Sequence, residues 1–358
     1  MSQTLGQIKT YDTVNGMEEA LCFVHEGKEH WVKRYLNNDR YQVCGFLGTG
    51  GLGCVYTAYD RWNCDNMVVI KTPYYMGDYC FPCVSRGKAV FERQINSLNK
   101  IYLREKKHLV ELSNAGFDSV VNLNDFFYDR SVDLCKSFHN AARVKYQVAE
   151  NYRENTPFLV MKYIRGKTLG KIIEEKPLGN YKTLVIAKQI LALMKYMHKR
   201  RVSNKGKEYY YLLCDLKAEN IIVTDDMHIS LIDFGAVKIY WTAHGEVDIP
   251  IFVTDGYAAP EVYSGSLEFI DNPRIDERFD LFTLGALMSY CLTGIKPRDF
   301  LTNTTPPQYN FDLDNYDNIT KNVKNIVKKS TMHQRQERYQ NSSTMLYEVL
   351  NELSRFQG

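Results

Sequence analysis

The spacing of hydrophobic residues changes along the chain, from the short runs typical of strands to the 3.6-residue period typical of helices. Apolar, β-branched and aromatic runs of strand length occur at residues 20–24, 31–35, 67–71, 120–127 and 158–163. One helical pattern lies among them, at residues 90–101. After Gly166, two long apolar segments fit buried helices instead, at residues 184–197 and 281–292. The pattern predicts an α+β fold in two lobes, the first β-rich with one main helix and the second mostly helical.

The length of 358 residues agrees with about two folding units, since a domain averages roughly 150 residues. We place the boundary between the lobes where strand-like segments give way to helical ones, so that the lobes occupy residues 41–162 and 163–358. Residues 1–40 are predicted to be an accessory segment with two strands around the turn His25-Glu26-Gly27-Lys28. Long inserts are expected at about 99–119, 129–156 and 201–211.

Composition narrows the class of protein without identifying it. With 44% hydrophobic and 24% charged residues, the chain is not expected to be disordered. The net charge of +3 is too small and too evenly spread to predict binding to nucleic acid or to a membrane surface. The sequence contains no run of 18 apolar residues, so it does not predict a membrane span. Nine cysteines, an odd number scattered through a long chain, favour a reducing, cytoplasmic setting over a disulfide framework.

A glycine-rich motif follows the strand that begins at Tyr41. Gly48, Gly50 and Gly53 lack a Cβ, so a turn of this kind lets backbone N–H groups approach phosphate oxygens. The residues after it fit a strand, whereas a dinucleotide-binding loop needs a helix there. Lys71 ends the next apolar strand, where it could pair with phosphate beneath the loop. Taken alone, both features also fit an ordinary glycine-rich hairpin and an exposed strand end.

Residues 215–220 and 233–235 carry the most specific chemistry, as Asp-Leu-Lys-Ala-Glu-Asn and Asp-Phe-Gly. Phosphoryl transfer requires a carboxylate to orient and deprotonate a hydroxyl, a cation for the moving group, and oxygen ligands for Mg²⁺. Asp215, Lys217, and Asn220 with Asp233 supply this set. The apolar runs between these residues predict a hairpin that brings Asn220 and Asp233 together at its open end. An acidic, solvated hairpin is the alternative interpretation.

These motifs, in this order, resemble those of the eukaryotic-type protein kinase superfamily, and the resemblance covers about residues 41–339. Ala259-Pro260-Glu261 matches the end of the activation segment. Asp280 matches a buried aspartate of the family, and Arg338 matches a late arginine that pairs with Glu261. The resemblance implies a two-lobed protein kinase fold with ATP and Mg²⁺ bound between the lobes.

The resemblance also implies the function and the site. The γ-phosphoryl group of ATP would be transferred to Ser or Thr hydroxyls of protein substrates, with Asp215 and Lys217 as catalytic residues and Asn220 and Asp233 as metal ligands. Thr254, at a position typical of Ser/Thr-directed members, favours these acceptors over tyrosine. The nucleotide-binding residues implied by the resemblance are Gly48, Gly50, Gly53, Val55, Val69, Lys71, Met161, Lys162, Ile164 and Ile222.

One departure from the family's pattern concerns the partner of Lys71. The helix after this lysine offers Gln94, four residues before Leu98, where the family has a glutamate. An amide can hydrogen-bond the lysine, but without the strength that a charge gives. Glu92 is the alternative partner, although two residues along a helix place it on another face.

A second departure is Cys214, which precedes Asp215 where the family has the arginine that receives an activation-loop phosphate. Between the Asp-Phe-Gly and Ala-Pro-Glu motifs only Thr242 and Thr254 carry Ser/Thr hydroxyls, and Thr254 is expected to be structural. We therefore predict activity that does not require activation-loop phosphorylation.

A third departure is Val69, which replaces an alanine above the adenine and is expected to weaken ATP binding by overpacking. Together with Gln94 and Cys214, it motivates the alternative of a pseudokinase that acts as a nucleotide-binding or allosteric scaffold. A small-molecule kinase is a further alternative, against which the Ala-Pro-Glu segment argues. Cys80 and Cys83, with Cys22-Phe-Val-His25, have the spacing of a zinc site, although unpaired reduced thiols are the default.

Overall fold

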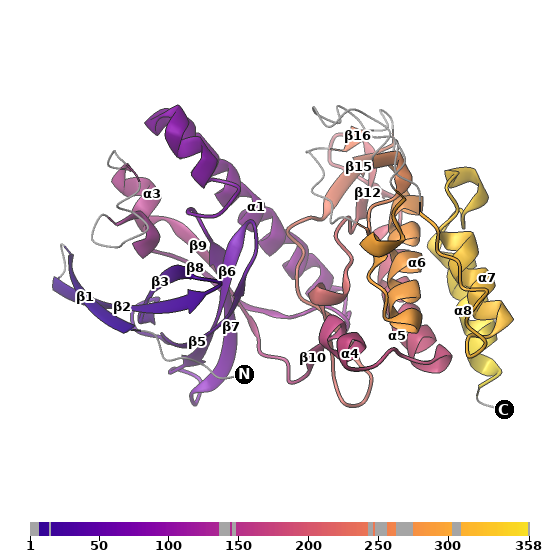
Figure 1. Cartoon of the computed structure of the whole chain (residues 1–358). Coiled ribbons are helices and arrows are strands. Elements are labelled where there is room, and N and C mark those ends of the chain that lie inside the picture. Colours follow the sequence, from indigo (N-terminus) through magenta and orange to yellow (C-terminus); the bar gives the residue numbers. More distant parts are fainter. Residues whose placement is uncertain are drawn as a thin grey trace. The chain divides into compact units, whose positions relative to one another are not determined.

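A computed structural model describes residues 7–13, 16–135, 144, 148–242, 246–247, 256–262, 275–302 and 309–356. The chain divides into two compact units (Figure 1). The N-terminal unit comprises Met1–Asn114 and Val121–Tyr163, and the C-terminal unit comprises Ala115–Val120 and Ile164–Gly358. The first is rich in strands and the second in helices, which confirms the predicted α+β division.

The N-terminal unit is built on a six-stranded antiparallel sheet with the strand order β4-β5-β6-β7-β9-β8. Its strands are β4 (Tyr35–Leu36), β5 (Tyr41–Thr49), β6 (Gly53–Asp60), β7 (Asn66–Pro73), β8 (Leu123–Asp129) and β9 (Thr156–Lys162). The other elements of this unit are η1 (Phe81–Arg86), α1 (Lys88–Asn114), η2 (Val132–Leu134) and α3 (Glu150–Glu154). The helix α1 packs against β7, β8 and β9.

Most of the predicted insert at 99–119 is helical, because α1 continues without a break to Asn114. Between β7 and α1 the chain forms a buried turn at residues 74–77 and then η1. The helical pattern at 90–101 is confirmed. Hydrophobic periodicity indicates that a helix is present, but it does not indicate at which residue the helix ends.

A second, three-stranded sheet precedes the main one, formed by β1 (Gln7–Thr13), β2 (Gly16–His25) and β3 (Lys28–Lys33). The predicted strand pair and its turn are confirmed, because Glu26 and Gly27 both have positive φ, as a two-residue hairpin turn requires. The strand β1 was not predicted, since its residues alternate without an apolar run.

Both faces of this small sheet are covered. Leu21, Phe23 and Val32 belong to the core of the six-stranded sheet. Tyr11, Ala20, Cys22 and Trp31 pack in a separate cluster with Val132 and Cys135. The sheet β1-β2-β3 is therefore an integral part of the N-terminal unit rather than an appendage to it.

The C-terminal unit contains two small sheets, with strand orders β10-β13-β14 and β11-β12-β15-β16. Its helices are α4 (Leu169–Glu175), α5 (Asn180–Met197), α6 (Glu277–Thr293), α7 (Lys321–Ser330) and α8 (Ser342–Ser354). Its strands are β10 (Lys167–Thr168), β11 (Arg201–Val202), β12 (Glu208–Leu212), β13 (Ile221–Val223), β14 (Ile229–Leu231), β15 (Lys238–Trp241) and β16 (Glu246–Val247). Short 3₁₀ segments are η3 (Ala218–Asn220), η4 (Pro260–Val262), η5 (Pro297–Phe300) and η6 (Arg335–Glu337).

The helix α6 forms the core of the C-terminal unit, and every residue from Phe279 to Leu292 is buried. It begins where the side chain of Asp276 accepts the N–H of Arg278, and it ends at Gly294, whose φ of 73° suits glycine. The helices α5 and α7 pack against it. A helix that is apolar and buried on all sides gives its few polar side chains, such as Asp280, a fixed position.

No helix in the described part of the chain combines the length and the apolar character that a membrane span requires.

Asp133, in η2, is an acid inside the N-terminal unit with only 5% of its surface exposed. Burial raises the pKa of its carboxyl group to about 7, against a smaller opposing effect of a hydrogen bond from the backbone of Trp31. Its Oδ1 has no hydrogen-bond partner within the described residues. Ionising this group in the folded protein therefore carries a large desolvation cost.

The contribution of Asp133 to stability is expected to fall as the pH rises from about 4 to about 7, because an acid whose pKa rises on folding binds a proton in the folded state that the unfolded chain has released. Asp133→Asn removes this dependence. We expect the variant to gain, relative to wild type, on the order of 2 kcal/mol more unfolding free energy at pH 8 than at pH 5.5. Urea denaturation at both pH values measures it, and an equal effect of the substitution at the two values would contradict the prediction.

Candidate active site

The glycine-rich loop joins β5 to β6 in the N-terminal unit. The N–H of Gly50 donates to the carbonyl of Gly53 at 2.9 Å, which closes the turn, and Gly48 has a φ of 157°. Gly53 is buried and leaves no space for a side chain. A Cβ there would lie 1.8 Å from the hydroxyl oxygen of Tyr102 and 2.6 Å from the carbonyl oxygen of Thr72. A glycine is therefore required at this position by the packing of the unit alone.

Lys71 pairs with Glu105 of α1, with its Nζ 2.8 Å from Oε1 and 3.0 Å from Oε2. Both side chains are buried, with 8% and 1% of their surfaces exposed. The pair is thus a charge-assisted contact shielded from water, and it connects the end of β7 to the middle of the long helix.

The prediction that Gln94 or Glu92 is the partner of Lys71 is wrong. Gln94 donates to the backbone carbonyl of Tyr79 at 3.1 Å, and Glu92 accepts the N–H of Ala149 at 2.8 Å. Glu105 lies eleven residues after Gln94, which is slightly more than three helical turns, so the two share a face of α1. The partner of Lys71 expected from the sequence, Gln94, lies four residues before Leu98. The leucine four residues after Glu105 is Leu109, which is also buried.

Glu105→Ala is expected to cost about 3–5 kcal/mol of unfolding free energy, because it removes the carboxylate from a buried ammonium group. Gln94→Ala, on the same face of the same helix, removes one neutral hydrogen bond and is expected to cost about 1 kcal/mol. Denaturant titration of both variants measures the difference, and equal losses would contradict the assignment of Glu105.

The apolar residues expected around adenine fall on neighbouring strands. Val55 on β6 pairs in register with Lys71, and Val69 on β7 pairs with Met161 on β9. Met161 is buried, whereas Lys162 is exposed and donates its backbone N–H to the carbonyl of Asn122 at 3.0 Å. The remaining two, Ile164 and Ile222, are half-buried residues of the C-terminal unit.

Asp215, Lys217 and Asn220 contact one another in the loop that follows β12. The Nζ of Lys217 lies 2.8 Å from Oδ2 of Asp215. The side-chain amide of Asn220 donates to the backbone carbonyl and to Oδ2 of Asp215, each at 3.1 Å. The structure therefore places a carboxylate, an ammonium group and an amide together, as the sequence predicts.

The backbone just before Asp215 is strained and is held by a buried carboxylate. Cys214 has a φ of 63°, and the N–H of Asp215 donates to the carbonyl of Leu213 at 2.9 Å, which forms a three-residue turn of the rare, strained kind. The N–H groups of Leu213 and Cys214 donate to Asp280, at 2.9 and 3.0 Å. His198 was not predicted, and its Nε2 lies 2.9 Å from the same carboxylate.

The predicted hairpin that carries the metal-ligand candidates is confirmed as β13 and β14. At its open end the N–H of Ile232, next to Asp233, donates to the backbone carbonyl of Asn220 at 3.0 Å. The N–H of Gly235 orients Oδ1 of Asp233 at 3.0 Å. Because the amide nitrogen of Asn220 is engaged with Asp215, its carbonyl oxygen is the atom suited to a metal. An amide and a carboxylate oxygen fit Mg²⁺, which takes its remaining ligands from water and phosphate.

The structure gives no support to the zinc alternative. Cys22 packs in the cluster with Trp31 and Cys135, whereas Cys80 lies in the core of the six-stranded sheet. Among the described residues, no three His, Cys, Asp or Glu side chains lie close enough together to hold a metal ion. None of the nine cysteines, all of which lie in described segments, forms a disulfide.

The segment after Asp-Phe-Gly enters a sheet. The strand β15 pairs with β12 from Tyr209–Trp241 to Leu212–Lys238, and with β16 on its other side. Thr242 donates its hydroxyl to the carboxylate and to the carbonyl of Glu208, at 3.0 and 3.2 Å. The predicted insert at 201–211 supplies the strands β11 and β12 of this sheet. Thr254 lies outside the described residues.

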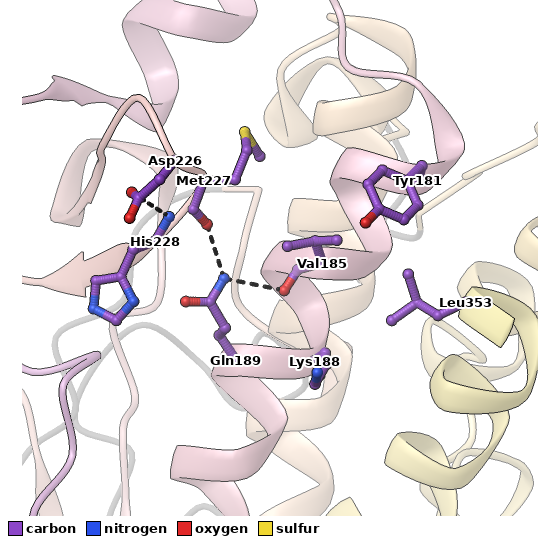
Figure 2. Close-up of a pocket in the computed structure, with 8 residues that line it drawn as sticks. All are labelled: Tyr181, Val185, Lys188, Gln189, Asp226, Met227, His228 and Leu353. Carbon is purple, nitrogen blue, oxygen red and sulfur yellow. Dashed lines mark hydrogen bonds between the residues drawn. The ribbon is translucent and has the colours of Figure 1, made fainter. Parts of the chain in front are cut away.

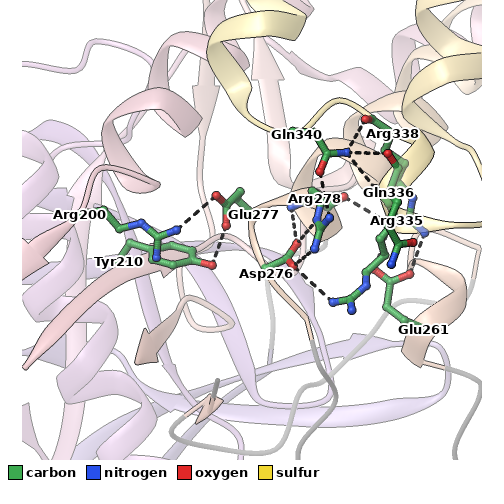
Figure 3. A network of polar contacts seen from close by, with 10 residues as sticks. All are labelled: Arg200, Tyr210, Glu261, Asp276, Glu277, Arg278, Arg335, Gln336, Arg338 and Gln340. Carbon is green, nitrogen blue, oxygen red and sulfur yellow. Dashed lines mark hydrogen bonds and ion pairs between the residues drawn. The ribbon is translucent and has the colours of Figure 1, made fainter. Parts of the chain in front are cut away.

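Glu261 and Arg338 form the ion pair that the resemblance implies, with N···O distances of 2.9 and 2.7 Å (Figure 3). The guanidinium group is buried and also donates to the carbonyls of Met332, His333 and Arg278. A planar group with five donors is fully used here, which fixes the end of the activation segment against α6 and the residues around η6.

The same network continues to the start of α6 (Figure 3). Glu277 accepts the hydroxyl of Tyr210 at 2.7 Å and lies 3.5 Å from Arg200. Burial and this carboxylate raise the pKa of Tyr210. Burial alone would raise the pKa of Asp276, but its bonds to Arg278 outweigh burial and lower it. The network thus joins β12, which leads into the loop that carries Asp215, to the start of α6.

A pocket of about 350 Å³ lies elsewhere on the C-terminal unit, at the closed end of the β13–β14 hairpin (Figure 2). It is lined by Tyr181, Val185, Lys188, Gln189, Asp226, Met227, His228 and Leu353. Gln189 bridges its walls by donating to the carbonyls of Met227 and Val185. None of the predicted catalytic residues lines this pocket.

The chain matches the family model described as "Protein kinase domain" over residues 41–354. Serine/threonine-protein kinase cds1 of Schizosaccharomyces pombe is 29% identical over 174 residues, which cover 48% of this chain and 35% of that protein. Serine/threonine-protein kinases D and A of Synechocystis sp. are 25% and 24% identical, over 88% and 74% of this chain and 52% and 42% of their own lengths. The chain thus spans about a third to a half of the length of these relatives.

Proposed function

The chain belongs to the protein kinase domain family, and on that premise we propose that it transfers the γ-phosphoryl group of ATP to Ser or Thr hydroxyls of protein substrates. The observation that carries the proposal is the contact of Asp215 with Lys217 and Asn220. Phosphoryl transfer is catalysed mainly by positioning and by charge stabilisation, and these three groups supply both. The relatives named as serine/threonine-protein kinases favour this class of acceptor.

In the proposed reaction each residue has one role. Asp215 orients the acceptor hydroxyl and receives its proton, and Lys217 stabilises the charge on the transferred group. Lys71, fixed by Glu105, holds the α- and β-phosphates. Asn220 and Asp233 would hold Mg²⁺, whose charge neutralises the phosphate oxygens when it is bound.

The nucleotide is proposed to bind the remaining residues that the sequence predicts for this purpose. The glycine-rich loop, with Gly48, Gly50 and Gly53, offers backbone N–H groups to the phosphates. The adenine contacts are the apolar side chains and hinge backbone predicted for this purpose, Val55, Val69, Met161, Lys162, Ile164 and Ile222. The two methyl groups that Val69 adds over alanine are expected to weaken ATP binding without preventing it.

The alternative is a pseudokinase that binds nucleotide without transfer. Three departures from the family's pattern suggest this alternative. The first, Gln94, no longer argues for it, because Lys71 has a charged partner in Glu105. Cys214 does not disturb the loop, since Asp280 holds its backbone. Val69 remains and affects only affinity. The balance of these contacts favours the active enzyme.

Asp215→Asn is the direct test of the reaction. The variant is expected to fold and to show a melting shift with Mg-ATP, but to lose phosphotransfer by at least about 10²-fold, since it can no longer accept the proton. Labelled ATP with a generic protein acceptor measures it. Asp225→Asn, an exposed residue on the turn of the neighbouring hairpin, serves as the matched control.

Three outcomes of this experiment are distinct. Transfer by wild type and by Asp225→Asn but not by Asp215→Asn supports the proposal. A melting shift with Mg-ATP and no transfer by wild type supports the pseudokinase. Transfer by Asp215→Asn at a rate near that of wild type would refute the assigned role.

We further propose that activity does not require activation-loop phosphorylation. Support comes from the pairing of β15 with β12 and β16, which orders the start of this segment through backbone hydrogen bonds. It also comes from Thr242, whose hydroxyl donates to Glu208. A phosphate on Thr242 would lie beside this carboxylate, and like charges repel.

Thr242→Val is therefore expected to keep kcat within about threefold of wild type, because the variant loses only the hydroxyl contacts with Glu208 at a half-exposed site. Thr242→Glu is expected to lower activity, since it places a second carboxylate next to Glu208. Phosphatase treatment of the wild-type protein should leave the rate unchanged. Loss of turnover after phosphatase treatment, or in Thr242→Val, would contradict this part of the proposal.

The free thiols of all nine cysteines are consistent with a reducing compartment, and we propose a cytoplasmic enzyme on this ground.

A further inference from the structure

Tyr102 connects the glycine-rich loop to the helix that carries Glu105. It lies on α1 one turn before Glu105 and is buried, with 1% of its surface exposed. Its hydroxyl lies 3.5 Å from the backbone carbonyl oxygen of Leu52, inside the loop. The Nζ of Lys71 lies 5.7 Å from the centre of its ring. One side chain is therefore next to both of the groups proposed to hold the phosphates of the nucleotide.

The contact with the loop is close because residue 53 is a glycine. A Cβ on Gly53 would lie 1.8 Å from the hydroxyl oxygen of Tyr102 and 3.1 Å from its Cζ. The tyrosine thus occupies the space that any other residue at position 53 would need. Positions 50 and 51 differ, because a Cβ on either glycine would meet nothing within 4 Å.

A second contact holds the same carbonyl of the loop. The N–H of Tyr74, just after β7, donates to the carbonyl oxygen of Leu52 at 3.2 Å. A carbonyl oxygen has two lone pairs and can accept both bonds. The loop is therefore attached to the chain after β7 through its backbone, and to α1 through the phenol of Tyr102.

We propose that Tyr102 is a positioning residue for the nucleotide phosphates. It holds Gly53 and Leu52 at a fixed distance from α1, so that the loop and the Lys71–Glu105 pair keep one geometry. This inference rests on the proposed function, because it assumes that the loop and Lys71 bind phosphate. It adds that the loop is positioned by a side chain of the helix, and not by strand pairing alone.

The test uses two ligands, the non-hydrolysable analogue Mg-AMP-PNP and adenosine, which lacks phosphates. Their affinities for the full chain are measured by calorimetry. Tyr102→Phe is expected to weaken Mg-AMP-PNP binding about three- to tenfold, the range for the loss of one hydrogen bond that positions the loop, and to leave adenosine binding unchanged.

Tyr75→Phe is the matched control. The hydroxyl of Tyr75 is also buried and donates to Asn99 at 2.6 Å and to Thr156 at 3.2 Å, within the same unit. Its loss is expected to lower the melting temperature at least as much as that of Tyr102, without changing the affinity for either ligand. The comparison separates positioning of the loop from general stability.

A second pair of variants tests the contact from the loop side. Gly53→Ala is expected to weaken Mg-AMP-PNP binding more than tenfold, because the added methyl group displaces Tyr102 and collides with the carbonyl oxygen of Thr72. Gly51→Ala, in the same loop, is expected to stay within about threefold of wild type, since its Cβ enters open space.

The possible results are separable. If wild type binds adenosine and Mg-AMP-PNP, and Tyr102→Phe loses affinity for the second only, the inference is supported. Equal affinity of Tyr102→Phe and wild type for both ligands overturns it and leaves the proposed function intact. Tighter binding of Mg-AMP-PNP by Tyr102→Phe also overturns it, because the hydroxyl would then obstruct the phosphates. Failure of wild type to bind Mg-AMP-PNP overturns both proposals.

Discussion

The carboxylate of Asp280 is the constraint on which the conformation of the loop carrying Asp215 depends. It is fully buried in α6, and it accepts the N–H groups of Leu213 and Cys214 while His198 contacts the same group. A buried carboxylate is tolerable only when donors surround it, and here two of those donors belong to a strained turn. The group therefore stabilises a backbone conformation that the chain would otherwise leave, and the position of Asp215 follows from it.

In the N-terminal unit the long helix α1 has the corresponding role. Glu105 fixes Lys71, and Tyr102, one turn earlier, contacts the glycine-rich loop. The sheet β1-β2-β3 lies outside the residues that match the family model. It packs against β5, the strand that leads into the glycine-rich loop. Phe23 and His30 stack on Phe46 of β5, with ring centroids 5.8 and 4.9 Å apart. Burial lowers the pKa of His30 to about 4, so this aromatic contact stays neutral at physiological pH.

In both units, segments proposed to act in phosphoryl transfer are attached to well-packed neighbours. The activation segment is tied by β12 at its start and by the Glu261–Arg338 pair at its end. The first attachment uses backbone hydrogen bonds and the second a buried guanidinium group, and neither depends on a phosphate. These two attachments are the structural support for the proposal that activity does not require a phosphate on this segment.

The sequence by itself determined the two-lobed protein kinase fold and brought Asp215, Lys217, Asn220 and Asp233 into one hypothesis. These residues are close in sequence or joined by a short hairpin, so local spacing is enough to bring them together. Only the tertiary structure decided which residue of α1 faces Lys71, because positions eleven residues apart share a helical face and no local signal separates Gln94 from Glu105. The tertiary structure also decided that both faces of the sheet β1-β2-β3 are covered, and that Tyr102 lies against Gly53. Those contacts join segments far apart in the chain, where burial and shape, rather than pattern, select the partner.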